Sequence, residues 1–309
     1  MEKKEKSQSK LGRGIEDIGA VVSNIANKAK RKTGDVKDSV VDAMDVNGNG
    51  EFDIEDIIIY GLKIPGIHVD RGNFLRKEFM KRYPQDVIDD AVRYNPAHAQ
   101  IPLEDINEIA DEVIKYERNL VSGISAALGM PGGIAMAATI PMDLGQYYGY
   151  MLRAAQKLMY LYGFPEIDTT EKNQTFDSET LNILILCLGA MYGVAGANAA
   201  LRGIAGAFAK GVEKKLLRTA LTKGTIYPIV KSVAKWFGVN MTKSVFANFF
   251  KKAIPVVGGV IGGGITFLSF KPCCDKLKAS LQDTLLSNPN HVAAEEETII
   301  MNGVREATI

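Results

Sequence analysis

Apolar residues recur along most of this chain three and four positions apart, a spacing that places them on one face of a helix. Near the N-terminus, for example, they fall at Ile15, Ile18, Val22, Ile25 and Ala29. Alternation with a period of two, the pattern of a half-buried strand, is almost absent. The pattern therefore predicts an all-α fold, a helical bundle whose core helices are apolar and rich in Gly and Ala.

Changes in composition along the chain divide it into four parts. A charged start gives way to an acidic, Asp- and Asn-rich loop, then to long helical patterns, and finally to a polar end. We expect a basic tail and amphipathic helix at 1–34, a helix-loop-helix module at 35–64, a helical domain at 70–285 whose halves divide near 165–180, and a polar C-terminal tail at 286–309.

Segments 122–142, 181–201 and 253–270 carry no charged residue and contain many Gly and Ala. Each is about long enough to cross a bilayer. Small residues four positions apart, such as Gly189 and Gly193, allow helix backbones to approach closely, in membranes or in tight bundles. We favour buried helices of a compact domain, with hairpin insertion and membrane spanning as the alternatives.

The segment 45-DVNGNGEFDIED-56 resembles the calcium loop of an EF-hand. Such a loop places oxygen ligands at positions 1, 3, 5, 7, 9 and 12 and a glycine at position 6, which here is Gly50. A helical pattern over 54–63 leaves the loop and ends before Pro65. The expected Ca²⁺ ligands are Asp45, Asn47, Asn49, the Glu51 carbonyl, Asp53 and Asp56.

This loop departs from the usual pattern in two ways. Position 12 is Asp56 rather than Glu, so the ligand is one methylene shorter and predicts a weaker site. The loop is also single, although EF-hands normally work in pairs. An Asx-rich turn between two helices is the alternative to a metal site, and a calcium site here could be a switch or a structural clip.

Charge is distributed unevenly, although the net charge is only +1. Residues 35–117 hold 19 acidic and 9 basic residues, a difference of −10. Residues 202–252 hold 11 basic residues and one acidic residue, a difference of +10. Basic helices with interleaved aromatic residues suit an anionic membrane surface. The candidate lipid-facing residues are Lys214, Lys215, Arg218, Lys231, Lys235 and Trp236.

Two other interpretations of the basic region remain open. The region could be a solvated surface, or it could dock on the acidic half of the chain. Nucleic acid is a weaker candidate partner because no recognisable reader module accompanies the charge.

A candidate ligand pocket lies on the helix expected at 143–162. Asp143, Gln146, Tyr147 and Tyr150 fall on roughly one face of it, and a buried carboxylate there could act in acid–base chemistry. We favour a simpler role, in which Asp143 caps the start of this helix. No known catalytic motif is present, so we expect a non-enzymatic protein and keep an enzyme or small-ligand binder as the alternative.

The cysteines and the N-terminus indicate the compartment. Cys187, Cys273 and Cys274 are not spaced as a disulfide framework, which suits a reducing environment. The charged start leads into no apolar signal segment. We therefore expect a cytoplasmic protein, peripheral at the inner face of the membrane.

Two glycine-rich segments, one in each half of the helical domain, resemble the EcsC protein family. They contain GMPGG (129–133), TIPMDLGQYY (139–148), AQKLMYLYG (155–163) and AIPVVGGVIGGGITFLSFKP (253–272). The resemblance covers roughly 70–285 and implies a bacterial, intracellular, mostly helical protein associated with an ABC-transporter operon. The molecular function of that family is not established, so no site residue can be carried over.

The leading hypothesis is a calcium-binding helical protein that associates with an anionic membrane or a membrane protein. In it, calcium stiffens the N-terminal module and reduces the negative charge facing the basic half. The alternatives are an enzyme or small-ligand binder with a site around Asp143, and a structural module in which calcium completes folding.

Overall fold

The computed structural model describes residue 45 and residues 53–128, 136–167, 178–240 and 258–306. Within these ranges every regular element is a helix, which confirms the predicted all-α class. The helices are α3 (Ile54–Lys63), α4 (Arg71–Phe79), α5 (Gln85–Arg93), α6 (Leu103–Leu128), α7 (Met136–Leu161), α8 (Ser178–Tyr192), α9 (Ala197–Ala209), α10 (Lys214–Thr222), α11 (Tyr227–Asn240), α13 (Gly258–Leu281) and α14 (Glu295–Arg305). The amphipathic helix expected at 1–34 and the first helix of the 35–64 module lie outside the described residues.

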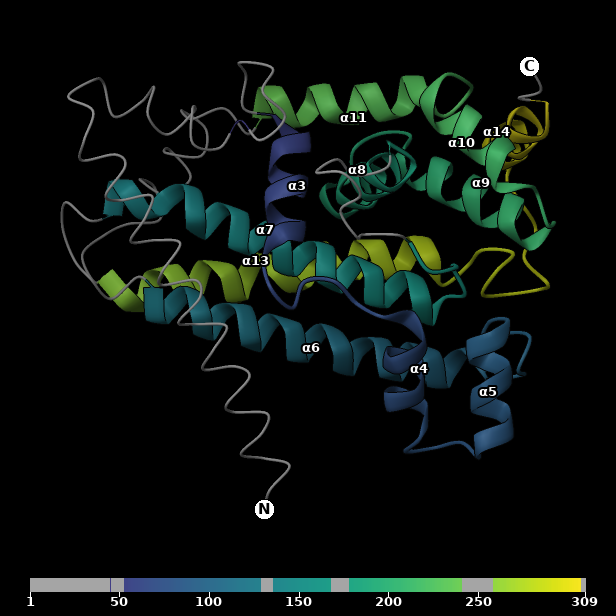
Figure 1. The fold of residues 1–309 in the computed structure, drawn as a ribbon, viewed down its shortest axis with the longest axis horizontal. Coiled ribbons are helices and arrows are strands. Elements are labelled where there is room, and N and C mark those ends of the chain that lie inside the picture. The colour runs from purple at the N-terminus through teal and green to yellow at the C-terminus, as the bar shows by residue number, and fades with distance from the viewer. Residues whose placement is uncertain (1–44, 46–52, 129–135, 168–177, 241–257, 307–309) are drawn as a thin grey trace.

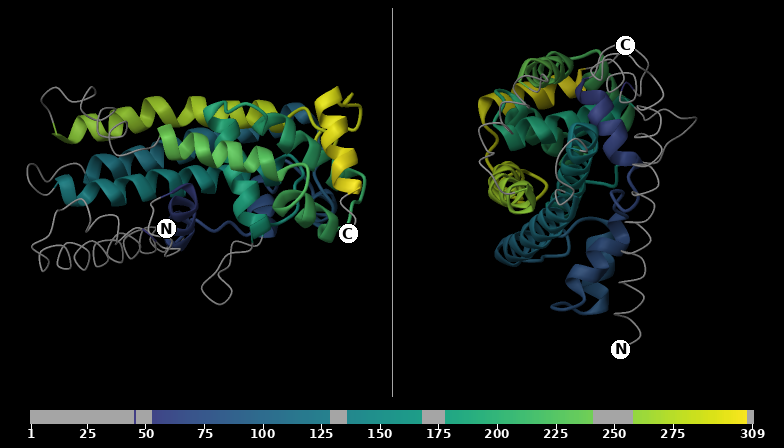
Figure 2. Two further views of the ribbon diagram at one scale, coloured as in Figure 1. Left: turned by 90° about the horizontal axis from the view of Figure 1, so that it is seen from above. Right: turned by 90° about the vertical axis from the view of Figure 1, so that its left-hand side faces the viewer.

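Three long helices, α6, α7 and α13, lie side by side along the length of the molecule (Figures 1 and 2). The apolar spacing of α6 explains its place, because Ile106, Ile109 and Val113 recur on one face and are buried. Helix α8 contacts α13, α7 and α9, and α3 crosses α7. The small helices α4 and α5 pack on the outside of this layer (Figure 1).

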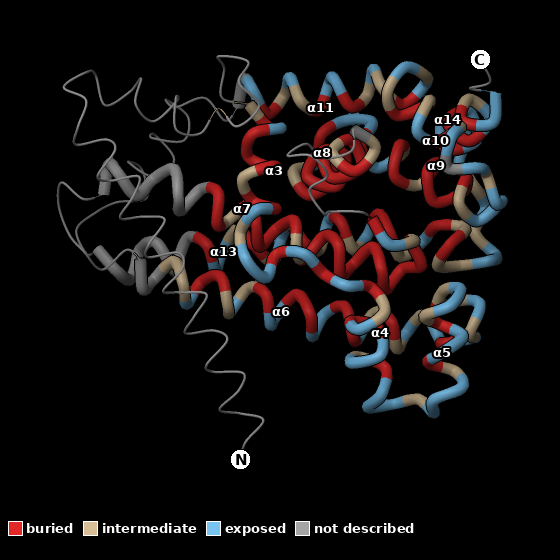
Figure 3. Tube along the Cα trace, in the orientation of Figure 1, coloured by how far each residue is buried: buried red, intermediate tan, exposed pale blue. Residues whose placement is uncertain are grey.

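Buried residues line the facing sides of the helices and almost fill α8 (Figure 3). No apolar side chain from Ile183 to Met191 exposes more than 1% of its surface. The apolar segment 181–201 therefore supplies core helices of the bundle. Among the described residues, no helix has the length and apolarity that crossing a bilayer requires.

Glycines allow close helix contacts at some of the expected positions. A Cβ on Gly189 would lie 2.8 Å from Val233, so α8 and α11 approach closely there. Gly193 differs from the expectation. It has a φ of +73° and ends α8, with the Val194 amide donating to the Gly189 carbonyl at 2.8 Å.

The expectation of a polar C-terminal tail at 286–309 is wrong for much of that range. Residues Glu295–Arg305 form α14, which packs on α9 and buries Ile300, Met301 and Val304. These apolar residues form a short stripe behind three consecutive glutamates, so composition alone hides the helix. The C-terminal part of the chain thus belongs to the folded bundle.

Candidate functional site

The structure describes Asp45, Asp53 and Asp56 of the expected calcium loop, whereas residues 46–52, with Asn47, Asn49 and Glu51, lie outside the described residues. Helix α3 begins at Ile54, as the sequence predicts, and Asp53 is its N-cap. The described residues contain no group of three or more His, Cys, Asp and Glu side chains that could hold a metal.

Asp53 and Asp56 form a reciprocal capping box at the start of α3. Asp53 Oδ1 accepts hydrogen bonds from the amides of Glu55 at 2.8 Å and Asp56 at 3.2 Å. Asp56 Oδ2 accepts from the Asp53 amide at 3.0 Å, and its side chain is buried. Burial and the nearby charges of Asp53 and Asp56 raise the pKa of Glu55. A carboxylate has about four acceptor positions, so this cap is compatible with metal binding by the same side chains.

The candidate ligand pocket on α7 is largely a buried helix face. Gln146 is 3% exposed and Tyr150 is 8% exposed. The Tyr147 hydroxyl lies 3.0 Å from the Ser269 hydroxyl of α13. Burial raises the pKa of Tyr147 and of Tyr150, which keeps both phenols neutral at physiological pH. Gln146, Tyr147 and Tyr150 therefore lie on a largely buried face of α7.

Asp143 does not have the predicted capping position. Helix α7 begins at Met136, so Asp143 lies about two turns inside it. A carboxylate caps a helix only at the N-terminus, where backbone amides lack intrahelical partners. The Asp143 side chain lies outside the described residues, and its role as a pocket carboxylate stays a prediction.

A buried acid between two cations lies farther along the same face. Glu117 of α6 is fully buried, and its Oε1 lies 2.5 Å from Lys157 Nζ and 3.5 Å from Arg153 Nε. Burial lowers the pKa of Lys157, against the opposing charge of Glu117. Arg153 also lies over the Tyr150 ring, 5.8 Å from its centroid. Charged groups therefore join α6 to α7 within the core.

Buried polar atoms without a hydrogen bond also lie on these two helices. Among the described residues, the buried side-chain atoms without a hydrogen bond all lie on α6 or α7. They are Glu117 Oε2, Ser122 Oγ, and Gln146 Oε1 and Nε2. Gln146 lies seven residues before Arg153, which places it on the same face of α7 roughly 10 Å away. Buried polar atoms are normally paired, so each of these atoms is a candidate partner for a water or a small polar molecule.

Most of the predicted lipid-facing residues lie on the outside of α10 and α11. Lys215, Arg218, Lys231 and Lys235 are exposed, and we call this set the cationic face. In Figure 3 both helices lie along one edge of the molecule. Within the described residues, Lys215, Lys231 and Lys235 form no ion pair, and Lys231 Nζ lies over the Tyr227 ring at 4.9 Å. The Lys214 side chain lies outside the described residues.

Trp236 differs from the other members of the predicted lipid-facing set. It is half-buried at the edge of the core, with ring centroids 5.8 Å from Tyr192 and 5.0 Å from Phe237. Its position on α11, next to the buried Phe237, turns the indole toward α8. Trp236 therefore packs at the edge of the core, and a lipid-facing role for it stays a prediction.

No protein-family model, curated protein or solved structure matches this chain. The resemblance to the EcsC family, which rests on the glycine-rich segments alone, stays a prediction.

Sequence reasoning missed Glu117, although the chain carries a signal for it. Glu117 follows Ala110 and Val113 at helical spacing and precedes Val121, so it falls on the buried face of α6. A charge in such a row predicts a buried partner on a neighbouring helix. Which helix supplies that partner, here α7 with Arg153 and Lys157, depends on tertiary packing.

Proposed function

We propose that this chain is a non-enzymatic, calcium-binding protein of EcsC type that attaches to an anionic membrane surface at the cytoplasmic side. The observation that carries the proposal is the cationic face, whose exposed lysines have no ion-pair partner among the described residues. Calcium binding rests on the register of residues 45–56 and on the position of Asp53 and Asp56 at the start of α3.

The charge of this face is large enough to matter. Each cation close to an anionic leaflet contributes on the order of 1 kcal/mol. The three lysines of the face would therefore contribute roughly 3 kcal/mol, which corresponds to about 150-fold in membrane partitioning. Lys231 and Lys235 are four residues apart on α11 and therefore project from the same side of the helix.

Vesicle flotation tests the membrane proposal. The protein is mixed with phosphatidylcholine vesicles, with or without phosphatidylserine, in the presence and absence of calcium. We expect flotation only with the anionic lipid, and weaker flotation at high salt. The double variant Lys231→Gln/Lys235→Gln should bind about thirtyfold more weakly. The matched control, Lys115→Gln/Lys276→Gln, removes two exposed lysines of α6 and α13 and should bind normally.

The outcomes separate the claims within this proposal. Absence of flotation under every condition removes the membrane-surface proposal, and binding to native membrane vesicles alone assigns a membrane protein as the partner. Equal flotation with and without calcium would indicate that calcium has a structural role and does not control membrane binding. Calorimetry with Asp45→Ala tests calcium binding itself and avoids Asp56, whose replacement would also break the cap of α3.

A second candidate function is favoured by Gln146. Its amide is buried, and neither its oxygen nor its nitrogen has a hydrogen bond among the described residues, which suits a small polar ligand that can both donate and accept. If no such ligand binds, Gln146→Leu removes an unsatisfied group and should raise the melting temperature. If one binds, native mass spectrometry should show it on the wild type, and Gln146→Leu should lose it.

A further inference from the structure

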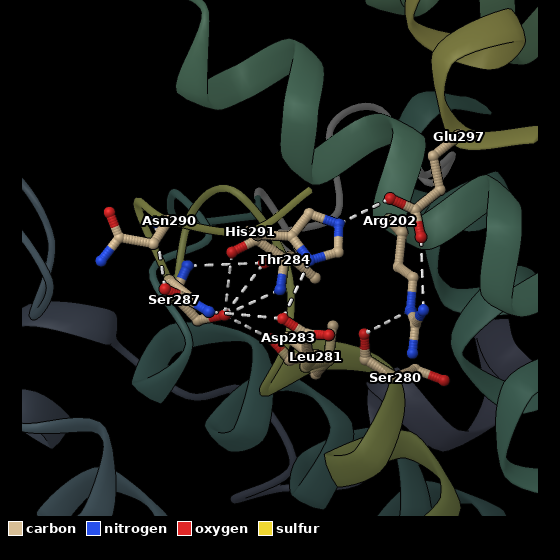
Figure 4. A network of polar contacts seen from close by, with 10 residues as sticks. Arg202, Ser280, Leu281, Asp283, Thr284, Ser287, Asn290, His291 and Glu297 are labelled. Carbon is tan, nitrogen blue, oxygen red and sulfur yellow. Dashed lines mark hydrogen bonds and ion pairs between the residues drawn. The ribbon is translucent and has the colours of Figure 1, made fainter. Parts of the chain in front are cut away.

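A histidine near the C-terminus lies between two carboxylates (Figure 4). His291 is on the segment that joins α13 to α14, and its side chain is only 6% exposed. Its Nδ1 lies 2.9 Å from Asp283 Oδ1, and its Nε2 lies 2.8 Å from Glu297 Oε2. Asp283 follows the end of α13, whereas Glu297 is a buried residue in the first turn of α14.

Arg202 of α9 completes this network (Figure 4). Its terminal nitrogen donates to Glu297 Oε1 at 3.2 Å, and its Nε donates to the Ser280 carbonyl at 3.3 Å. The Ser280 hydroxyl bonds Asn198 Oδ1 of α9 at 2.6 Å. The network therefore connects α9, α13, α14 and the joining segment.

The geometry around His291 suits a protonated ring. An imidazolium donates from both nitrogens, whereas neutral imidazole donates from only one. Loss of the proton therefore removes one of the two hydrogen bonds and both charge attractions. Water can replace the bond at Asp283, which is 55% exposed, but not at Glu297, which is 4% exposed.

The segment that carries His291 leads directly into α14, which packs closely against α9. A Cβ on Gly203 would lie 2.4 Å from Ile300, and one on Gly206 would lie 2.2 Å from Met301, so α14 sits directly on the backbone of α9. Glu297 lies three residues before Ile300 on the same face. Loss of the contact at Glu297 therefore loosens the end of α14 from which this packing begins.

We propose that Asp283, His291 and Glu297 form a proton-operated clasp, which fastens α14 onto α9 at mildly acidic pH and loosens when His291 loses its proton. The clasp does not depend on membrane or calcium binding. It gives the C-terminal helix a docking equilibrium that depends reversibly on pH.

The charges that face His291 support this pH range. Burial alone would lower the pKa of His291, but hydrogen bonds and charges from Glu297 and Asp283 outweigh it and raise the pKa above 6.5. The remaining charge in the network is Arg202. Stabilisation by His291 is thus fully present below its unfolded-state pKa and is lost as pH rises through its raised folded-state pKa.

Asp283 sets the acidic limit of the clasp. The hydrogen bond from His291 lowers the pKa of Asp283 below its usual 3.8, against a smaller opposing effect of burial. Its contribution is present above the usual value and is lost as pH falls through the lowered folded-state pKa. The clasp is therefore closed between the two folded-state pKa values.

Hydrogen exchange of residues 295–304 tests the clasp. Wild type and His291→Gln are compared at the same pH, from about pH 5.5 to about pH 9, so that the intrinsic exchange rate cancels in the ratio. We expect the variant to exchange about tenfold faster at the acidic end, because it loses a charged hydrogen bond. The ratio should approach one at the alkaline end. His98→Gln, which replaces an exposed histidine beside the Tyr94 ring, should give a ratio of one throughout.

A ratio for His291→Gln that does not change with pH would overturn the proposal, because His291 would then act by packing alone. An NMR titration that places the pKa of His291 below 6.5 would overturn it as well. If His291→Gln does not fold, Asp283→Asn at the exposed end of the clasp provides the same comparison. It should move the loosening of α14 to lower pH, because the hydrogen bond and charge of Asp283 help to raise the pKa of His291.

Discussion

At the scale of single residues, the Glu117 carboxylate is the most constrained charge described in the core. It is fully buried, and Lys157 and Arg153 both contact the same oxygen. Removing water from all three groups is costly, and mutual attraction repays that cost only while every partner is present. The stability of the α6–α7 contact should therefore depend strongly on the acid that neutralises the two cations.

Glu117→Ala should lower the free energy of unfolding by about 3–5 kcal/mol, because it leaves two largely buried cations without their acid. Urea denaturation followed by far-UV circular dichroism measures the change. Glu112→Ala is the matched control on α6, since Glu112 pairs with Arg82 at the surface and is 60% exposed. It should change the free energy of unfolding little. Equal effects of the two substitutions would show that burial of Glu117 does not increase its contribution to the free energy of unfolding.

Local chemistry made some of these positions predictable. The helical pattern over 54–63 correctly predicted α3, and Pro65-Gly66 correctly predicted its end. The contacts of Gln146 could not be predicted, because its face of α7 meets α6, and only packing decides which groups lie opposite. The role of Asp143 was misjudged because α7 starts earlier than Pro141 suggests.

At the scale of elements, α14 and α9 fit together because α9 carries glycines where α14 carries bulky residues. Gly203 faces Ile300, whose β-branched side chain is stiff. The sequence predicted helices with long apolar stripes, but it did not predict α14, whose stripe is short and flanked by charge. Its burial becomes evident only once α9 offers a surface of matching shape.

Gly203→Ala should loosen α14, although alanine is the better helix former. The new Cβ would lie 2.4 Å from Ile300 Cγ2, and overpacking of this kind typically costs about 1–3 kcal/mol. Faster hydrogen exchange of residues 295–304 is the expected result, and Ile300→Ala in the same chain should partly reverse it. Gly123→Ala on α6, where a Cβ would have no described neighbour within 4 Å, should stabilise the protein by about 0.5–1 kcal/mol. A stabilising Gly203→Ala would contradict the close packing.

At the scale of the whole molecule, the two halves expected on either side of 165–180 share one hydrophobic core. Its buried residues run from Ile54 on α3 to Val304 on α14 and include Leu158 of α7 and Leu186 of α8. The polar linker suggested separate halves, because composition records where the chain is polar but not which helices pack across the gap. Helices from both sides of the linker therefore stabilise one another.

Thermal or urea unfolding should accordingly show one transition. Trp236 is the only tryptophan and lies in the second half, so its fluorescence reports on α11 and α8. Circular dichroism reports on all helices. The two signals should give the same midpoint, as a cooperative unit requires. Midpoints that differ clearly would show that the halves unfold separately.

The fit of α14 on α9 also has a consequence for anyone who shortens this chain. The polar composition after residue 286 suggests that the chain could be truncated there. That cut would remove α14 and leave the backbone of α9 at Gly203 and Gly206 uncovered, beside the apolar residues that α14 shields. An uncovered apolar strip of this kind can bind the same strip of another molecule. The shortened protein should therefore tend to self-associate, and a chain kept to Arg305 should not.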